Sequence, residues 1–178
     1  MWVFRAGKDG ALYDCVIKNS QVFLPWDGYH EDLSNYETMS EFRKLVEREK
    51  GTTNRTSVSN WASQLMIFAK TSKAGDCVLI PAHRSKHYTL AKISGDYEYI
   101  KDNEEMLRHT RKIIVIDELI PREVFSQEVK YMLGAYRTVF KIKNEGLVLQ
   151  QIEQWRSSNS QEHLPKSEKT ISEIDFEL

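Results

Sequence analysis

Residues 75–99, which read GDCVLIPAHRSKHYTLAKISGDYEY, place the strongest constraint on the fold of this chain. Two strand-like runs, 76–82 and 87–94, flank a short polar link, and this arrangement predicts a β-hairpin. The segment carries no combination of acid, base and nucleophile that would suit catalysis. We therefore expect it to build part of a sheet.

The rest of the chain alternates between short strand-like runs and a few helical segments. Further strands are predicted at 1–6, 11–19, 21–26, 111–118 and 137–142. Helices are predicted at 38–51, 57–70, 120–134 and 145–158. The first helix has clear ends, because Thr38 and Glu41 have capping-box spacing and Gly51 is a natural stop. We expect the second to begin at Thr56 or Ser57 and the third to carry Pro121 in its first turn. This order predicts an α+β protein built on a small curled β-barrel with inserted helices.

The length and composition are those of a soluble domain followed by a tail. The chain has 178 residues, 40 % hydrophobic residues and a formal net charge of −1, so any contact with nucleic acid needs a local basic surface. No apolar run has transmembrane length, and no leader is visible, so no membrane partner is expected. Cys15 and Cys77 are expected to be buried free thiols of a cytoplasmic protein. The polar stretch 159–178 is expected to be a flexible tail.

The sequence gives little support for an enzyme. His83 and His87 are expected to be loop residues rather than metal ligands, and we expect no metal site and no cofactor. The triplet Glu128-Val129-Lys130 matches the Glu-x-Lys of some metal-dependent nucleases, but it falls in a predicted helix where that chemistry needs a strand. The sequence therefore predicts a protein without catalytic residues.

Several stretches, taken in order, resemble one family. MWVFRAG, the segment SVSNWASQLMIFAKTSKAGDCVLI and the run YTLAKISGDYEY resemble EVE domains. The overall layout is similar to the N-terminal domain of Mrr-like restriction system proteins. Six motifs of that domain have counterparts here, in the same order, at residues 2–7, 26–34, 61–65, 75–78, 95–99 and 138–142. The resemblance covers residues 1–142, and it leaves 143–178 as a helical segment and tail. The nuclease domain that Mrr-like proteins carry has no counterpart after residue 142.

The resemblance implies a PUA-like, EVE-type barrel that binds nucleic acid and takes one modified base out of the stack. DNA is favoured over RNA, in a restriction-type defence role, and an RNA-binding module of the same fold remains an alternative. A second alternative is an adaptor that recruits a partner nuclease through the segment EGLVLQQIEQW at 145–155. A flipped base regains its stacking from aromatic rings, and its edge needs hydrogen-bonding groups. The expected pocket residues are Arg5, Ala6, Gly7, Trp26, Asn60, Trp61, Gln64, Tyr97 and Tyr99.

Structural roles are open for several of these residues. Trp61 also lies on the apolar stripe of its helix and could belong to the core, and Asn60 could be an ordinary helix residue. Tyr97 and Tyr99 could pack under the acidic loop 26–36. Phosphate contacts are expected from basic side chains, and the candidates are Lys73, Arg84, Lys86 and Arg108, with Arg111 close by.

Overall fold

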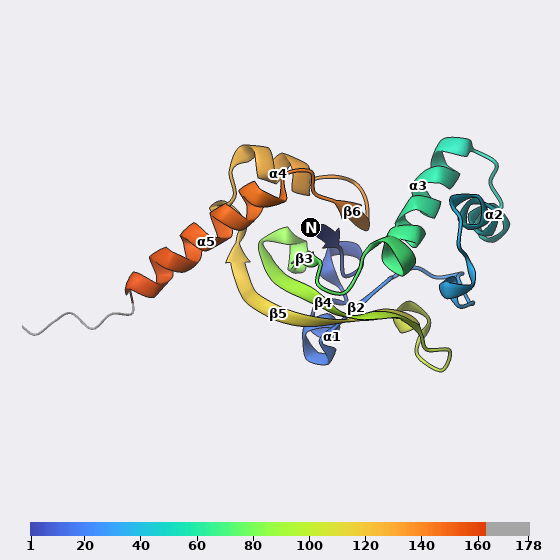
Figure 1. The fold of residues 1–178 in the computed structure, drawn as a ribbon, viewed down its shortest axis with the longest axis horizontal. Helices are drawn as coiled ribbons and strands as arrows, with labels where there is room; N and C mark the ends of the chain where they lie inside the picture. Colours follow the sequence, from blue (N-terminus) through green and yellow to red (C-terminus); the bar gives the residue numbers. More distant parts are fainter. Residues whose placement is uncertain (163–178) are drawn as a thin grey trace, which may run out of the picture.

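One six-stranded sheet forms the centre of the protein, whose structure is a computed structural model that describes residues 1–162. The strands are β1 (Trp2–Phe4), β2 (Gln21–Phe23), β3 (Cys77–Pro81), β4 (His87–Tyr99), β5 (His109–Pro121) and β6 (Val139–Lys141). Their order is β2-β5-β4-β3-β1-β6, and only β1 and β3 pair in parallel. The sheet curls strongly into an open half-barrel (Figure 1). The predicted mixture of helices and a curled sheet is confirmed at this level of detail.

The curl comes mainly from the long hairpin of β4 and β5. Both strands have 13 residues, and Ile93 faces Ile113 across the pair. Three shifts of register interrupt the pairing between Tyr88 and Tyr97. An extra residue in one strand bends it and increases its twist, so the hairpin wraps around the core instead of lying flat.

Helix α2 (Met39–Lys50) has the ends that the sequence predicts. The Oγ1 atom of Thr38 accepts a hydrogen bond from the backbone N–H of Glu41 at 3.3 Å, and the Glu41 carboxylate accepts one from the Thr38 N–H at 2.7 Å. Gly51 ends the helix with a φ of +60°, which a glycine adopts at little cost. The capping box and the stop are thus confirmed.

Helix α3 (Arg55–Met66) begins just upstream of the expected start, and this expectation is therefore corrected. Asn54 is the N-cap, and its side-chain oxygen accepts from the Ser57 N–H at 3.0 Å. The helix continues as a π-helical turn over Ile67–Thr71. Arg111, which is buried, donates to the carbonyls of Phe68 and Ser72 and so satisfies groups that the end of a helix leaves open. Arg111 is consequently a structural residue and no part of a phosphate-binding surface.

The prediction of a strand over 11–19 is wrong, because this segment contains helix α1 (Tyr13–Asn19). Its buried residues, Tyr13 and Val16, are three positions apart and so lie on the same helical face. The hydroxyls of Tyr13 and Thr89 are joined by a 2.5 Å hydrogen bond, which ties α1 to β4. A short apolar run does not distinguish a helix from a strand by its period, and here tertiary packing selects the helix.

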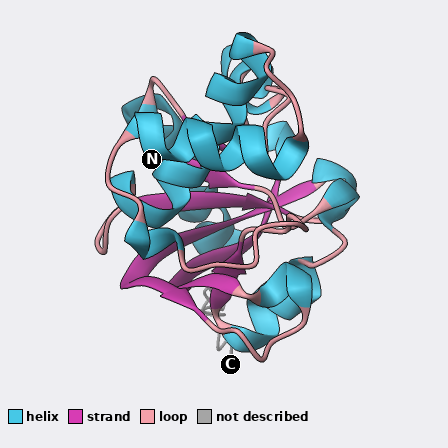
Figure 2. Cartoon of the chain, turned by 90° about the vertical axis from the view of Figure 1, so that its right-hand side faces the viewer, coloured by secondary structure: helices cyan, strands magenta, loops and turns pink. Residues whose placement is uncertain are grey.

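Each face of the sheet packs against its own core. Trp2 and Phe4 lie in the core with α1, α2 and α3, whereas Val3, between them in the sequence, lies in the core with α4 (Gln127–Leu133) and α5 (Glu145–Glu162). This alternation follows from the two-residue period of a strand, which places Trp2 and Phe4 on one face and Val3 on the other. Figure 2 shows the strands as one curved layer with helices packed around it.

The C-terminal helices differ in extent from the sequence prediction. Ser126 caps α4, while Pro121 ends β5 and precedes a separate 3-10 turn, Arg122–Val124, so the predicted single helix over 120–134 is divided in two. Helix α5 projects from the domain (Figure 1) and includes 159–162, which the sequence assigned to a flexible tail. Its Arg156 forms an ion pair with Asp117 of β5, which attaches the helix to the sheet. The remainder of the predicted tail, 163–178, lies outside the described residues.

Two further expectations concern the cysteines and the membrane. Cys15 and Cys77 are free thiols, but each is half-buried, whereas full burial was expected.

Across residues 1–162, none of the helices combines the length and the apolar composition needed to cross a bilayer.

Candidate functional site

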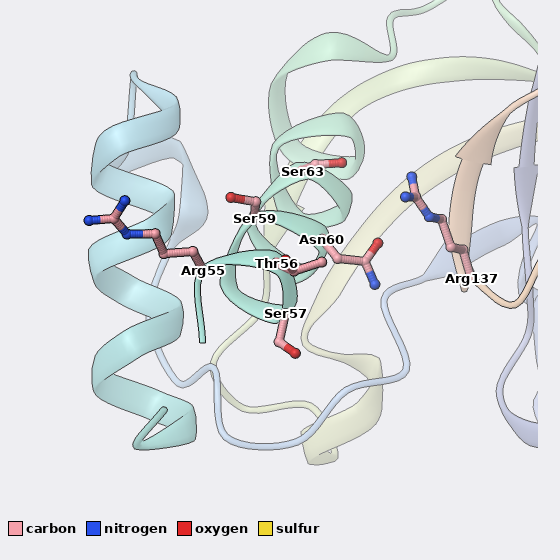
Figure 3. Close-up of a pocket in the computed structure, with 7 residues that line it drawn as sticks. All are labelled: Arg55, Thr56, Ser57, Ser59, Asn60, Ser63 and Arg137. Atoms are coloured by element: carbon pink, nitrogen blue, oxygen red, sulfur yellow. The ribbon is translucent and has the colours of Figure 1, made fainter. Parts of the chain in front are cut away.

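A cavity lies between the N-terminal half of α3 and the segment that leads into β6. Its volume is about 690 Å³. Figure 3 shows α3 on one side of it and Arg137 on the other. The lining residues are Arg55, Thr56, Ser57, Ser59, Asn60, Ser63 and Arg137. All of them are polar or charged, so the cavity suits a ligand that forms hydrogen bonds and carries negative charge.

The sequence of α3 explains this polar wall. Thr56, Asn60 and Ser63 recur at steps of four and three, which places them on one side of the helix. Val58 and Leu65 lie on the opposite side and are buried in the core with α2. The small hydroxyl side chains leave open space in front of the helix, because none of them extends far from the backbone.

Asn60 is the polar group of the cavity with the clearest unused capacity. Its Oδ1 atom is buried and has no hydrogen-bond partner in the structure. Its carboxamide points across the cavity toward the side of Arg137 (Figure 3). A carboxamide offers a donor and an acceptor side by side, and a buried acceptor without a partner is costly. A rotation of the Asn60 side chain would let a bound molecule with an N–H or O–H group reach this oxygen.

Arg5 fixes the opposite wall of the cavity. Its Nε donates to the carbonyl of Arg137 at 2.9 Å, and its Nη2 donates to the carbonyls of Leu133 at 2.8 Å and Ala135 at 3.2 Å. Burial lowers the pKa of the Arg5 guanidinium from its usual value. The sequence prediction placed Arg5 among the groups that touch a base. In the structure it holds the loop between α4 and β6 in position instead.

Gln64 and Trp26 complete this framework. The Oε1 atom of Gln64 accepts from the backbone N–H groups of Thr138 at 2.9 Å and Val139 at 3.0 Å. The indole N–H of Trp26 donates to the Thr138 hydroxyl at 3.2 Å. Both residues were predicted to meet a base, and both use these polar groups to anchor the start of β6. Trp26 is only 8 % exposed, so its ring is not the open aromatic face expected from the sequence.

Trp61 lies beside Trp26 and is only partly buried. The two rings meet edge to face, with centroids 4.6 Å apart. The ammonium of Lys50, from the end of α2, lies 4.7 Å from the centroid of the Trp61 ring. Trp61 thus combines the two roles left open by the sequence, because it packs on the core and keeps part of its ring near the surface.

Ala6 and Gly7 follow β1 and shape a turn. The carbonyl of Ala6 accepts from the Leu12 N–H at 2.8 Å, and Gly7 has a φ of +78°. Gly10, in the same turn, lies so close to Ala82 that an added Cβ would come within 3.0 Å of its backbone. Neither Ala6 nor Gly7 is among the described residues that line the cavity.

Tyr97 and Tyr99 belong to a separate cluster around the buried His109. The Tyr97 hydroxyl accepts from the Leu33 N–H at 3.0 Å and bonds the Nδ1 atom of His109 at 2.7 Å. The Nε2–H of His109 donates to the carbonyl of Tyr29 at 2.7 Å, which leaves Nδ1 as the acceptor of the Tyr97 proton. Burial lowers the pKa of His109 and raises that of Tyr97. The structure therefore favours the packing role of Tyr97 under the acidic loop.

The predicted phosphate-binding residues do not surround the cavity. Lys73, Arg84 and Lys86 are exposed, and they lie in the turns before β3 and β4. Arg108 donates to the carbonyl of Asn103 at 3.1 Å, and its Nη1 lies 2.8 Å from the Nδ1 of His30. The described residues that line the cavity include none of these four.

Sequence reasoning missed the two arginines that do line the cavity. Arg55 follows the N-cap Asn54, so a correct assignment of the start of α3 would have placed it in the first turn. Arg137 precedes β6 and meets α3 only through long-range packing, for which the sequence carries no local signal. Figure 3 shows the Arg55 guanidinium pointing away from Arg137, toward α2, so Arg137 is the cation that stands opposite Asn60 and suits phosphate or carboxylate oxygens.

The fold and the cavity define a mixed α/β domain with a strongly curled sheet and a polar cavity along one helix. The chain belongs to the DUF8426 family, described as a domain of unknown function, whose model matches residues 2–143. Neither a curated protein nor a solved structure matches the chain.

Proposed function

We propose that this chain is a PUA-like, EVE-type module that binds nucleic acid and holds one modified base in the cavity beside α3. DNA is the preferred ligand, and the role is recognition within a restriction-type defence system. The module performs no chemistry itself. An RNA-binding module of the same fold and an adaptor for a partner nuclease are the rival functions.

One observation carries this proposal. Asn60, whose side-chain oxygen is unpaired, and Arg137 line the same cavity from opposite sides (Figure 3). A nucleotide presents both kinds of partner, because its base edge carries N–H groups and its phosphate carries negative charge. The cavity volume of about 690 Å³ falls within the range of roughly 300–1,000 Å³ that is common for small-ligand sites.

A base inside a duplex cannot enter such a cavity, so the proposal requires the base to leave the stack. Trp61 supplies the nearest aromatic ring in the sequence, directly after Asn60, and it is partly exposed. Lys50 covers that ring and belongs to the exposed surface of α2, so a base can displace its side chain at low cost. Stacking on an aromatic ring is worth about 1–3 kcal/mol per base.

The test is a binding screen with short DNA and RNA duplexes that contain methylated or hydroxymethylated cytosine, methylated adenine or no modification. We expect one modified DNA to bind more tightly than its unmodified twin, with an affinity that falls as salt increases. Asn60→Ala should reduce this preference by about 1–3 kcal/mol, the usual value of a good contact to a base edge.

Charge needs its own control. Arg137→Ala should weaken binding to modified and unmodified DNA, whereas Arg43→Ala should leave binding unchanged, because Arg43 is an exposed residue of α2 that does not line the cavity. A preference for RNA would favour the first rival function. The absence of any oligonucleotide binding, together with a stable complex with a nuclease, would support the adaptor.

A further inference from the structure

The loop between α4 and β6 exposes an aromatic residue at the rim of the cavity. Tyr136 is fully exposed, and it directly precedes Arg137, which lines the cavity. Consecutive Cα atoms are about 3.8 Å apart, so the Cα atom of Tyr136 lies at that distance from the Cα atom of Arg137. Figure 1 shows this loop passing beside α3, which carries the other wall.

The backbone that carries Tyr136 is held on both sides. Arg5 binds the carbonyls of Ala135 and Arg137, the residues that immediately flank it. The Arg137 N–H donates to the Ala135 carbonyl at 2.9 Å, and Gln64 holds the N–H of Thr138. An exposed side chain on a rigid backbone loses little conformational freedom when it binds, which makes such a position suitable for contact with a partner.

Protein stability gives no reason for a tyrosine at this position. The Tyr136 ring is absent from both core clusters, and within residues 1–162 no aromatic or cation–π contact is found for it. Arg137 follows Tyr136 directly in the sequence, and the Arg5 guanidinium binds the carbonyls of the two residues that flank Tyr136. An aromatic ring next to cationic groups beside a cavity is the combination used to stack on bases and hold their phosphates.

We propose that Tyr136 is a wedge that enters the base stack of duplex DNA and fills the gap left by the base held beside Asn60. This inference rests on the proposed function and adds a second point of contact with the duplex. Removal of a base from a duplex costs a few kcal/mol in lost stacking, and an inserted ring offsets part of that cost. The wedge is needed only where a stack exists, so single-stranded DNA should bind without it.

The experiment compares one modified DNA as a duplex and as a single strand. Tyr136→Ala should lose about tenfold or more in affinity for the duplex, while its affinity for the single strand stays within about twofold of the wild type. Tyr136→Trp should retain the duplex affinity, because it keeps a planar ring. Tyr131→Ala is the matched control, since Tyr131 is 84 % exposed on α4 and does not border the cavity.

A direct measurement of base removal supports the comparison. A fluorescent adenine analogue placed next to the modified base in the same strand brightens when that base leaves the stack. The wild type should brighten it, and Tyr136→Ala at saturating protein should do so less.

The outcomes separate the two proposals. Equal binding of wild type and Tyr136→Ala to the duplex, or an equal loss for duplex and single strand, overturns the wedge and leaves the binding module standing. A wild type that binds no oligonucleotide at all overturns both.

Discussion

The side-chain oxygen of Gln64 on α3 accepts a hydrogen bond from the backbone N–H of Thr138 at 2.9 Å, just before β6. The same oxygen accepts from the N–H of Val139 at 3.0 Å. These two bonds join the walls of the cavity, because α3 carries Asn60 and the segment before β6 carries Arg137. The spacing between the walls therefore depends on one buried amide.

Removal of that amide should destabilise the protein. Gln64→Leu leaves two backbone N–H groups without a partner, and each buried donor without a partner costs about 1–3 kcal/mol. We expect the free energy of unfolding in urea to fall by at least that amount. Ser59→Ala, on the same helix and with no comparable bond, should change it by less than about 0.5 kcal/mol. Equal stability of the two variants would show that the bonds to β6 contribute nothing.

The two tryptophans beside the cavity should differ in their contribution to stability. Trp26→Ala empties a site that is nearly closed to solvent, and such a change costs about 3–5 kcal/mol. Trp61→Ala should cost less, about 1–2 kcal/mol, because its ring is only partly buried and its edge-to-face contact is worth about 0.5–1.5 kcal/mol. Urea titration of both variants decides the order.

Trp61, whose removal should cost the protein less stability, should nevertheless contribute to binding. Trp61→Ala should weaken binding to the best oligonucleotide by about 1–3 kcal/mol, and Trp61→Phe should recover part of the loss. Folded Trp61→Ala with unchanged affinity would remove Trp61 from the site. Each affinity must be corrected for the fraction of folded protein.

Stability should decline below neutral pH through His109. Burial lowers the pKa of this residue in the folded state, whereas its unfolded pKa is about 6.5. Above that pH, His109 is neutral in both the folded and the unfolded state, so its full contribution to stability is present. As pH falls below about 6.5, the unfolded state takes up the proton first, so the free energy of unfolding decreases until the folded pKa is reached.

Urea unfolding at several pH values between 5.5 and 8 tests this prediction. His109→Gln should flatten the dependence, because glutamine does not titrate in this range. His87→Gln is the matched control, since His87 is exposed and should leave the dependence unchanged. An unaltered pH profile in His109→Gln would contradict the assignment.

The purified chain should leave DNA uncut in the presence of Mg²⁺ or Mn²⁺. Glu128 and Lys130 lie on α4, as the sequence predicts, and not on a strand where the nuclease motif needs them. Asp117 is engaged in an ion pair with Arg156. Gel analysis of modified and unmodified duplexes is the measurement. Cleavage that disappears in Glu128→Ala, but persists in the exposed control Glu47→Ala, would make the chain a nuclease.

Much of the local structure could be predicted because its causes are local. The capping box of Thr38 and Glu41 acts within one turn, and the hairpin of β3 and β4 follows from two alternating runs and the link between them. The curled sheet was predicted from the number and length of the strands. The error at α1 arose where the apolar run was too short for its period to separate helix from strand.

The composition of the candidate site was predicted only in part. Asn60 was expected in a binding pocket and does border the cavity, because its position on the polar side of α3 depends on helical period alone. Arg5, Gln64 and Trp26 were expected there as well, but their polar groups bind the segment around Thr138. Sequence spacing contains no information on which distant backbone group a side chain will meet.

The sequence by itself determined the ends of α2, the hairpin of β3 and β4, and the polar side of α3, since each depends on residues within a few positions of one another. Only the tertiary structure decided that Arg137 lines the cavity, that Tyr97 is bound to His109, and that α1 is a helix. These features depend on contacts between residues far apart in the chain. Such contacts form only when the curled sheet brings the segments together, so packing and not local propensity sets them.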